Sequence, residues 1–451
     1  MAKFMDKNTK NKASAKCLAK SVSVVVLAAG LGTRMKSNKA KVLQKICGKS
    51  MILHILKQAY ALSDDVCVVL SHQKELVEDE IIKEFPNTRF LEQDLKNYAG
   101  TAGALRDYTP KYERIIALCG DMPLVKSSSI KALLDTKGKV AVAVFKSQNP
   151  ANYGRVVIEN DKIQKIVEFK DATEQERLIN ACNSGVYAFE SAILKELLPK
   201  INNQNAAKEY YLTDIIALAN EKGEFVSPVF VDEAEFMGVN DKYELAKAEN
   251  LMQDEFKMAL MKQGVIFHNP QSAFISLDAV FEGECEIYEG VRVEGKCVLK
   301  NAIIKSGSVV VEDSTIENSD IGPLAHIRPK CSIVNSHIGN FVECKNAILR
   351  GVKAGHLSYL GDCEIDEGTN IGCGTITCNY DGLKKHRTTI GKNVFIGSDT
   401  QLIAPVKIAD ESLIAAGSCV TSDVPSGSLF INRAKKQVIK DYFYQKFGVK
   451  K

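Results

Sequence analysis

The sequence predicts an α/β domain with a mostly parallel sheet, followed by a parallel β-helix built from hexapeptide repeats. Apolar, β-branched runs alternate with helical patterns over residues 22–247, as in βαβ units. From residue 390 to 420, an aliphatic residue occupies every sixth position. A helix repeats its apolar positions about every 3.6 residues and the side chains of a strand alternate, so neither explains a period of six.

The composition limits the classes of function. A chain of 451 residues is long enough for two or three domains. Its charged fraction of 25% and net charge of +4 indicate no nucleic-acid partner, and no apolar run predicts membrane insertion. The 13 cysteines are scattered rather than arranged as a disulfide framework. We therefore expect a cytoplasmic protein whose cysteines serve as small hydrophobic residues.

Residues 1–20 are rich in lysine and lack an apolar stretch. We expect a disordered basic leader here, or a start codon assigned too far upstream. An arm that binds nucleic acid is the alternative.

The α/β domain is expected over residues 21–240. Its predicted buried strands are Val22–Ala28, Asp65–Ser71, Arg114–Gly120 and Val140–Phe145, and the stretch Met51–Leu62 has the apolar spacing of a helix. In such a domain, ligands bind at the carboxyl ends of the parallel strands.

Residues 241–265 are expected to form a linker helix. Neither Gly nor Pro occurs between Asp241 and Gln263, and one helical stripe is apolar throughout: Leu245, Ala248, Met252, Phe256 and Leu260. We expect Gly264 to end this helix.

The β-helix is expected over residues 266–431, followed by a basic tail over residues 432–451. The six-residue spacing joins Ile390, Ile396, Leu402, Ile408, Ile414 and Val420, and it recurs in Ile287–Val293–Leu299, Ile321–Ile327–Ile333 and Ile365–Ile371. About 18 residues would complete one triangular turn and bury these side chains; a β-sandwich with chance spacing is the alternative. In the tail, Val438, Ile439, Tyr442 and Phe443 predict an amphipathic segment docked on a neighbour.

A glycine-rich loop follows the first predicted strand and reads Leu27-Ala28-Ala29-Gly30-Leu31-Gly32-Thr33-Arg34. Its small residues and amide N–H groups suit a polyphosphate, although a plain tight turn is the alternative. It lacks the ending of a P-loop and the third glycine of a dinucleotide fingerprint. Lys41 could add a second cation beside Arg34. Asp121 follows a buried strand, where its carboxylate would suit Mg²⁺ or would cap the next helix instead.

Two stretches of the coil break the six-residue period, Lys353–Tyr359 and Asn379–His386, and function is expected where the pattern fails. His356 lies near Tyr359 and among basic residues, which favours a site for an anionic substrate. Acetyl transfer from a thioester to an amine needs a base, and imidazole suits that task near neutral pH. A zinc site of Cys363, Cys373 and Cys378 is the metal alternative, but their spacing matches no common zinc pattern.

From about residue 22 to 433, the chain resembles the bacterial bifunctional N-acetylglucosamine-1-phosphate uridylyltransferase/glucosamine-1-phosphate N-acetyltransferase family. The motifs are Leu-Ala-Ala-Gly-Leu-Gly-Thr-Arg-Met with Lys-Val-Leu, combined with the coil and the Asn379-Tyr380-Asp381-Gly382 loop. The resemblance implies a Rossmann-like nucleotidyltransferase domain and a left-handed β-helix. It also implies UTP and acetyl-CoA as substrates, Mg²⁺ as cofactor and UDP-N-acetylglucosamine as the product.

By this resemblance, the UTP site would comprise Leu27, Ala28, Ala29, Gly30, Gly32, Arg34, Lys41, Gln93, Gly100 and Thr101. The amide of Gln93 would read uracil, beside a Gly100-Thr101 turn too tight for a purine. Asp121 and Asn240 would hold Mg²⁺. The sugar phosphate would be bound by Gly154, Glu168, Asn183 and Asn240. Its attack on the α-phosphorus of UTP would release pyrophosphate.

In the coil, the resemblance makes His356 the catalytic base, with Glu343 as its orienting partner. Glucosamine-1-phosphate would be bound by Arg328, Lys345, Tyr359 and Asn370. Acetyl-CoA would contact Cys373, Asn379, Tyr380, Lys385, Ser398, Ala416 and Arg433. A homotrimer is expected by the same analogy, with adjacent chains completing each acetyl site.

The sequence departs from the family pattern at four places. Ala40 replaces a proline, Cys119 an aromatic residue and Cys373 an alanine, and the segment Gln93–Gly100 is longer than usual. Two alternatives to the bifunctional enzyme stay open: a nucleotidylyltransferase with a purely structural coil, and a non-catalytic scaffold. The broken repeat at His356 argues against the first, and intact Arg34, Lys41 and Asp121 argue against the second.

Overall fold

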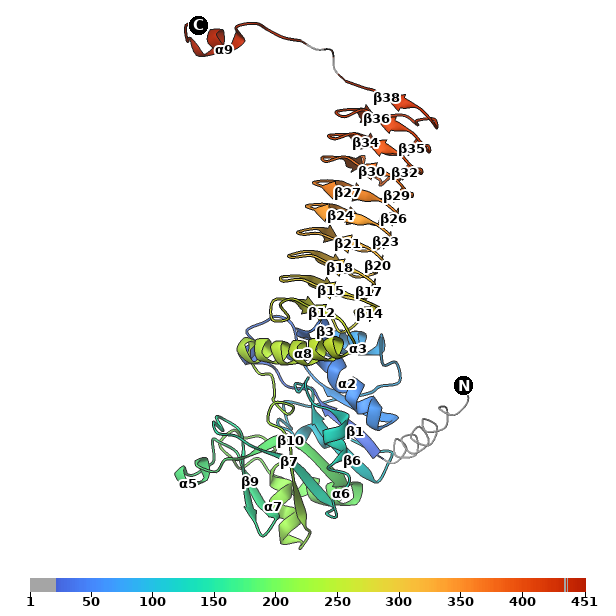
Figure 1. Ribbon diagram of the computed structural model, residues 1–451. Helices are drawn as coiled ribbons and strands as arrows, with labels where there is room; N and C mark the ends of the chain where they lie inside the picture. Colours follow the sequence, from blue (N-terminus) through green and yellow to red (C-terminus); the bar gives the residue numbers. More distant parts are fainter. Residues whose placement is uncertain (1–21, 434, 436) are drawn as a thin grey trace, which may run out of the picture. The chain divides into compact units, whose positions relative to one another are not determined.

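The structure is a computed structural model, and it describes residues 22–433, 435 and 437–451. The expected leader, residues 1–20, lies outside the described residues. The chain separates into two compact units that divide between Met252 and Gln253. The first contains the α/β fold and the second contains the coil (Figure 1).

A mixed sheet of nine strands forms the centre of the first unit. Its main path is β11 (Val226–Phe230), β7 (Val140–Lys146), β10 (Ala181–Glu190), β6 (Arg114–Cys119), β1 (Val22–Leu27), β4 (Asp65–Leu70) and β5 (Arg89–Glu92). Along this path only β10 is antiparallel to its neighbours. The hairpin of β8 (Arg155–Glu159) and β9 (Lys162–Val167) is attached to β10. The expected, mostly parallel sheet is thus confirmed, and its four predicted strands end within one residue of their predicted bounds.

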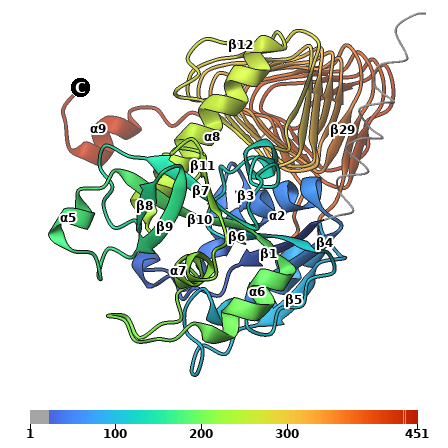
Figure 2. The same cartoon turned by 90° about the horizontal axis from the view of Figure 1, so that it is seen from below.

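Helices cover both faces of this sheet, because alternate residues of each strand point to opposite sides. Val24 and Val26 pack on the face covered by α2 (Met51–Leu62), α3 (Lys74–Ile82) and α4 (Ser127–Lys131). Val25 packs on the opposite face with α6 (Ser191–Leu197) and α7 (Asp214–Glu221), which lie side by side (Figure 2). Helix α2 has the predicted bounds.

Short elements complete the first unit. They are the 3-10 turns η1 (Thr33–Met35), η2 (Lys41–Leu43), η3 (Gly103–Leu105) and η4 (Leu198–Lys200), the hairpin β2 (Lys45–Ile46) and β3 (Lys49–Ser50), and helix α5 (Glu174–Arg177). Thr173 and Glu176 form a capping box at the start of α5.

A helix forms where the linker helix was predicted: α8 spans Lys242–Lys262. Its apolar stripe is at least partly buried along its whole length, with Ala248 fully buried. Gly264 takes a left-handed conformation with φ of 105°, and the N–H of the next residue, Val265, donates to the carbonyl of Leu260 at 3.1 Å. Gly264 therefore ends the helix as expected, because such a turn favours a residue without Cβ.

Three parallel sheets form the flat sides of the coil, and each strand pairs with the strand one turn further along the chain (Figure 1). The first side contains β12 (Ile266–Phe267), β15 (Glu286–Ile287), β18 (Ile303–Ile304), β21 (Asp320–Ile321), β24 (His337–Asn340), β27 (Lys353–His356), β30 (Asn370–Ile371), β33 (Phe395–Ile396), β36 (Leu413–Ile414) and β38 (Leu429–Phe430). The second contains β13 (Phe274–Ile275), β16 (Arg292–Glu294), β19 (Val309–Val311), β22 (His326–Ile327), β25 (Glu343–Lys345), β28 (Tyr359–Gly361), β31 (Ile376–Cys378), β34 (Gln401–Ile403) and β37 (Cys419–Val420). The third contains β14 (Val280–Glu282), β17 (Cys297–Lys300), β20 (Ser314–Glu317), β23 (Ser332–Val334), β26 (Ile348–Arg350), β29 (Cys363–Ile365), β32 (Thr388–Ile390) and β35 (Val406–Ile408).

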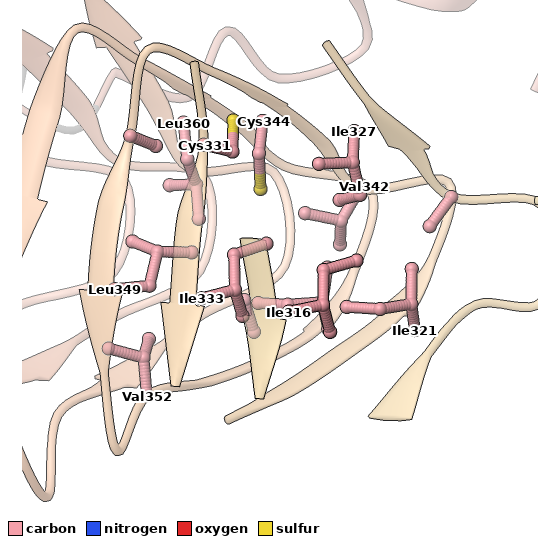
Figure 3. Close-up of a cluster of buried hydrophobic side chains, with 14 of the residues drawn as sticks. Ile316, Ile321, Ile327, Cys331, Ile333, Val342, Cys344, Leu349, Val352 and Leu360 are labelled. Carbon is pink, nitrogen blue, oxygen red and sulfur yellow. The ribbon is translucent and has the colours of Figure 1, made fainter. Parts of the chain in front are cut away.

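The aliphatic residues of the six-residue repeat line the interior of the coil. Ile390, Ile396, Leu402, Ile408, Ile414 and Val420 are each 0% exposed. Residues one turn apart stack in register, as Ile396 does with Ile414 on the first side. Figure 3 shows Ile316, Ile321, Ile327 and Ile333 packed together in an earlier part of the coil. The predicted hexapeptide coil is confirmed.

One turn of the coil is longer than its neighbours. Ile321 pairs with Ile338, a step of 17 residues, whereas Ile371 pairs with Ile396, a step of 25. The same step of 25 residues separates Ile365 from its partner Ile390 on the third side. The additional residues form the loop Asn379–His386, which leaves the register intact on either side of it.

The tail contains one short helix, α9 (Tyr442–Phe447), which begins later than the predicted amphipathic segment. Val438 and Ile439 lie before it and are 70% and 58% exposed. Tyr442 and Phe443 are 51% and 62% exposed, and docking of this segment on a neighbour stays a prediction.

Candidate functional sites

The glycine-rich loop leaves β1 at its carboxyl end and folds against the turn that follows β6. The N–H of Gly120 donates to the carbonyl of Leu27 at 2.8 Å. Gly32 has a φ of 62°, and a Cβ there would lie 2.7 Å from the Cβ of Lys41. A larger residue at position 32 would therefore clash, so the glycine is required by the close approach of two chain segments.

A cavity of about 640 Å³ opens beside this loop at the carboxyl ends of the parallel strands. All residues expected in the UTP site line it: Leu27, Ala28, Ala29, Gly30, Gly32, Arg34, Lys41, Gln93, Gly100 and Thr101. Asp121, Glu168 and Asn240 line it as well. Residues from distant parts of the sequence thus meet around one space large enough for a nucleotide.

Two cations and two oxygen ligands converge on one side of the cavity. The ammonium of Lys41 forms an ion pair with the carboxylate of Asp121 and donates to Oδ1 of Asn240 at 3.1 Å. Arg34 donates to the same Asn240 oxygen at 2.9 Å. The carboxylate of Asp121 is therefore held beside the cations that would meet the phosphates, rather than capping a helix.

Asp121 and Asn240 fit a site for Mg²⁺. Both oxygens contact one cation, the Lys41 ammonium, so a second cation could be shared between them in the same way. Among the described residues, no group of three or more His, Cys, Asp or Glu side chains is placed to hold a metal ion. Mg²⁺ is commonly held by one or two carboxylates together with substrate phosphates, and the ligands present suit that mode of binding.

Three of the four residues expected to bind the sugar phosphate lie close together, Gly154, Glu168 and Asn183, whereas Asn240 lies beside Lys41. A Cβ at Gly154 would lie 3.5 Å from Oε1 of Glu168, and the N–H of Asn183 donates to the carbonyl of Gly154 at 2.9 Å. Glu168 lines the cavity, whereas Gly154 and Asn183 do not. Burial raises the pKa of Glu168, and the hydroxyl of Thr213 lies 3.5 Å from its Oε1.

Glu209 and Tyr211 are among the cavity residues that sequence reasoning missed. They belong to the extended segment before α7. Burial and the nearby carboxylates of Asp171 and Glu168 raise the pKa of Tyr211 to about 12. No motif marks this segment in the sequence. The adjacent tyrosines Tyr210 and Tyr211, which precede a helix, are the only feature that could have indicated it.

The departures from the family pattern are accommodated locally. The N–H of Ala40 donates to Oε1 of Gln73 at 2.8 Å, a bond that a proline could not make. The thiol of Cys119 donates to the carbonyl of Gly185 at 3.4 Å and lines the cavity. Burial raises the pKa of Cys119 to about 12, so the thiol stays protonated at neutral pH.

His356 lies at the corner between the first and second sides of the coil and is exposed. Its Nδ1 lies 2.6 Å from Oδ1 of Asn340, one turn earlier. An amide oxygen can only accept, so Nδ1 donates, and in the neutral imidazole the lone pair is then on Nε2. The expectation that Glu343 orients His356 is wrong, because Glu343 accepts instead from Arg328 at 2.8 Å. Glu343 lies on the second side, around the corner from the imidazole.

The cations expected to bind a sugar phosphate are close together. The nearby positive charges of Lys385 and Arg328 lower the pKa of Lys345. Tyr359 stacks in register on Glu343 in the next turn, and Nδ2 of Asn379 lies 3.5 Å from the Tyr359 hydroxyl. Asn379 is buried, whereas the next residue, Tyr380, is 61% exposed.

Four of the expected acetyl-site residues stack in successive turns at one corner, and we call them the acetyl corner: His356, Cys373, Ser398 and Ala416. The backbone connects them in sequence, since Asp399 N donates to Cys373 O at 2.7 Å and Gly417 N donates to Ser398 O at 2.8 Å. Asn370 lies on the first side in β30. Lys385 and Arg433 are exposed.

The fold and these two sites define a transferase with a nucleotide-binding α/β domain and a hexapeptide-repeat coil. Residues 24–186 match the MobA-like NTP transferase domain, and residues 387–422 match six repeats of the bacterial transferase hexapeptide. The chain is 67% identical over 426 residues to the bifunctional protein GlmU of Campylobacter lari, covering 94% of this chain and 99% of that one. It is 68% identical to the protein of the same name from Campylobacter jejuni subsp. jejuni serotype O:6, with the same coverage.

The chain therefore belongs to the GlmU family of bifunctional enzymes, as the resemblance in its sequence predicted. It is a bifunctional transferase with a nucleotidyltransferase domain and a left-handed β-helical acetyltransferase domain. This relationship argues against a monofunctional enzyme and against a non-catalytic scaffold. No described helix combines the length and the apolar character that crossing a membrane requires.

Proposed function

We propose that the chain acetylates glucosamine-1-phosphate with acetyl-CoA in its coil and transfers UMP from UTP to N-acetylglucosamine-1-phosphate in its α/β domain. The product would be UDP-N-acetylglucosamine, a precursor of the bacterial cell envelope. The observation that supports this proposal best is the convergence of the ten predicted UTP residues on one cavity together with Asp121 and Asn240.

In uridylyl transfer, the small residues of the glycine-rich loop let the backbone amides approach the phosphates. Arg34 and Lys41 neutralise charge on the phosphate oxygens as pyrophosphate leaves. Asp121 and Asn240 would hold Mg²⁺, which supplies further charge neutralisation when bound. Glu168, with Gly154 and Asn183 behind it, orients the sugar so that its phosphate attacks the α-phosphorus in line. The P–O bond to pyrophosphate breaks as the new P–O bond forms.

In acetyl transfer, Nε2 of His356 takes a proton from the amine of glucosamine as the nitrogen attacks the thioester carbonyl. The C–S bond then breaks, and the leaving sulfur takes the proton from the His356 imidazolium, so coenzyme A leaves as a thiol. Asn340 holds the imidazole in the tautomer that this step needs. Arg328 and Lys345 hold the sugar phosphate, with Tyr359 and Asn370 beside the sugar. Acetyl-CoA would lie along the acetyl corner and the loop residues Asn379, Tyr380 and Lys385, towards Arg433.

We further propose that the acetyl site is completed in a homotrimer. At the corner that carries His356, three successive turns place large apolar residues in left-handed conformations: Leu324, Phe341 and Leu357 have φ of 55°, 57° and 44°. They are 51%, 52% and 58% exposed. Such residues rarely adopt this conformation, so an exposed apolar ridge here favours burial by a second copy of the chain.

A cytoplasmic location agrees with the cysteines. Those of the described residues are free thiols, and most are buried in the two cores. Buried free thiols suit a reducing compartment.

The proposed function is tested by supplying glucosamine-1-phosphate, acetyl-CoA, UTP and Mg²⁺ and measuring free thiol and pyrophosphate separately. Both products are expected. His356→Ala should stop thiol release, while pyrophosphate release from added N-acetylglucosamine-1-phosphate continues. Release of only one product by the unmodified enzyme would refute the dual assignment.

A further inference from the structure

One wall of the nucleotide cavity would face the base. Residues that do not themselves line the cavity hold this wall in position. We call residues 93–102 the base loop and residues 209–213 the strap. Gln93, Gly100 and Thr101 of the base loop line the cavity, whereas Tyr98 does not.

The amide of Gln93 has a fixed orientation. Gln93 is only 8% exposed. Its Nε2 donates to the carbonyls of Tyr98 and Gly100, both at 2.8 Å. Carbonyl oxygens can only accept, so the nitrogen must face the loop. Oε1 is left as an acceptor, and no hydrogen bond from the described residues reaches it.

A fixed acceptor distinguishes the two pyrimidine bases. Uracil carries a hydrogen on N3, which an amide oxygen can accept. The N3 of cytosine has a lone pair instead, and two acceptors facing each other in a partly buried site are unfavourable. The discrimination is lost if the amide can rotate and present its NH₂ group.

What prevents rotation is the position of the Tyr98 and Gly100 carbonyls, and that position is set by an aromatic clamp. The guanidinium carbon of Arg106 lies 3.4 Å from the centroid of the Tyr98 ring. The Tyr210 ring of the strap lies 5.6 Å from the same ring, centroid to centroid. The Tyr98 ring is thus held by a cation and by a second aromatic ring.

The strap also holds the base loop through its backbone. The N–H of Tyr210 donates to Ala99 O at 2.8 Å, and the N–H of Ala102 donates to Tyr210 O at 2.9 Å. A Cβ at Gly100 would lie 2.4 Å from Tyr210 O, so the two segments touch at the turn itself. Movement of Tyr210 therefore displaces the carbonyls that orient Gln93.

We propose that Tyr98, Arg106 and Tyr210 are positioning residues that set the preference for UTP over CTP by fixing the amide of Gln93. The proposal rests on the proposed uridylyl transfer and adds the element that determines which base is accepted. None of the three side chains needs to touch the nucleotide.

The test is the ratio of kcat/KM for UTP to that for CTP, measured by pyrophosphate release. In Tyr98→Ala the ratio should fall about tenfold or more, because the released amide can offer its NH₂ group to N3 of cytosine. Tyr98→Phe keeps the ring and should keep the ratio. The matched control is Tyr112→Ala. It also removes a tyrosine ring that contacts a cation, Lys111 Nζ at 5.0 Å, but this ring precedes the amino end of β6, whereas the cavity lies at the carboxyl ends of the strands.

Arg106→Gln provides a second variant if Tyr98→Ala does not fold, and it should lower the ratio in the same direction. The proposal would be overturned if a folded, active variant of either kind kept the UTP/CTP ratio of kcat/KM. An equal fall of kcat/KM with both nucleotides would overturn it as well. If the unmodified enzyme released no pyrophosphate from UTP, the proposed function itself would fail, which separates the two results.

Discussion

Nδ1 of His356 lies 2.6 Å from Oδ1 of Asn340, the residue stacked on it one turn earlier in the coil. The bond fixes the tautomer whose Nε2 can accept a proton. Asn340→Ala should therefore slow thiol release about ten- to a hundredfold, since the base loses its orientation but is still present. The measurement is the pH profile of thiol release together with pyrophosphate release in the same sample.

Asn340→Asp and Glu343→Gln separate orientation from charge. A carboxylate at position 340 would keep the bond and stabilise imidazolium, so the acidic limb of the profile should move to higher pH. Glu343→Gln removes the acceptor of Arg328 and should change KM for the sugar phosphate without moving that limb. A shift of the limb in Glu343→Gln would contradict the assignment of Asn340.

Asp121→Asn should lower uridylyl transfer about a hundred- to a thousandfold, because the carboxylate beside Lys41 and Arg34 is lost. Thiol release should persist at the unmodified rate. Asp64→Asn is the matched control: its carboxylate also pairs with a lysine, Lys111 at 3.7 Å, but lies away from the cavity. Parallel loss of both activities in Asp121→Asn would refute independent sites.

The KM of the acetyl reaction for the sugar phosphate should rise at alkaline pH. This rise should begin at a lower pH than it would if the pKa of Lys345 had its ordinary value. The charges of Lys385 and Arg328 lower the pKa of Lys345, so its proton is released at lower pH and the attraction for phosphate falls there. Lys385→Gln removes one of these charges and should move the alkaline rise in KM to higher pH. A rise in KM that stays at the same pH in Lys385→Gln would argue against this coupling.

The interior of the coil should dominate its stability. Ile408 is 0% exposed, and Ile408→Ala should cost about 2–5 kcal/mol of unfolding free energy, as large-to-small changes in a core do. Lys407→Ala, at the neighbouring exposed position, should cost less than about 0.5 kcal/mol. Denaturant unfolding followed by circular dichroism measures both, and similar losses would contradict the assignment of the corner residues.

Phe341→Glu places a charge on the exposed apolar ridge and should dissociate the proposed trimer. Size-exclusion chromatography with light scattering should then report one third of the unmodified mass, with loss of thiol release and retained pyrophosphate release. Lys330→Glu, also in a left-handed conformation but at a different corner, is the control and should leave the mass unchanged. An unchanged trimer in Phe341→Glu would place the interface elsewhere.

Much of the architecture was predictable because it repeats. The six-residue spacing of Ile390 to Val420 has one structural explanation, and all six side chains are buried as it requires. Helix α2 and the four predicted strands followed from apolar periodicity in the same way. Strand β10 was not among the predicted strands, and its antiparallel direction could not be predicted, because the alternation of side chains in a strand does not depend on its direction.

Site residues that belong to a short sequence motif were predicted. Site residues that are brought together only by the stacking of turns in the coil were missed. The glycine-rich loop and Asp121 are short motifs at strand ends. Asn340 was overlooked because its contact with His356 depends on the register of the coil, and Glu343, three residues further, has the more familiar chemistry of an orienting carboxylate. Glu209 and Tyr211 reach the cavity through an extended segment with no periodicity of its own.

The long turn between Ile371 and Ile396 adds the Asn379–His386 loop, and the strands before and after it keep their pairing. A corner of this coil is thus a place where residues can be added without moving the rungs above and below. The stacked aliphatic interior specifies the fold, whereas the loops at the corners supply binding residues. New binding loops could therefore be grafted at a corner without changing the fold.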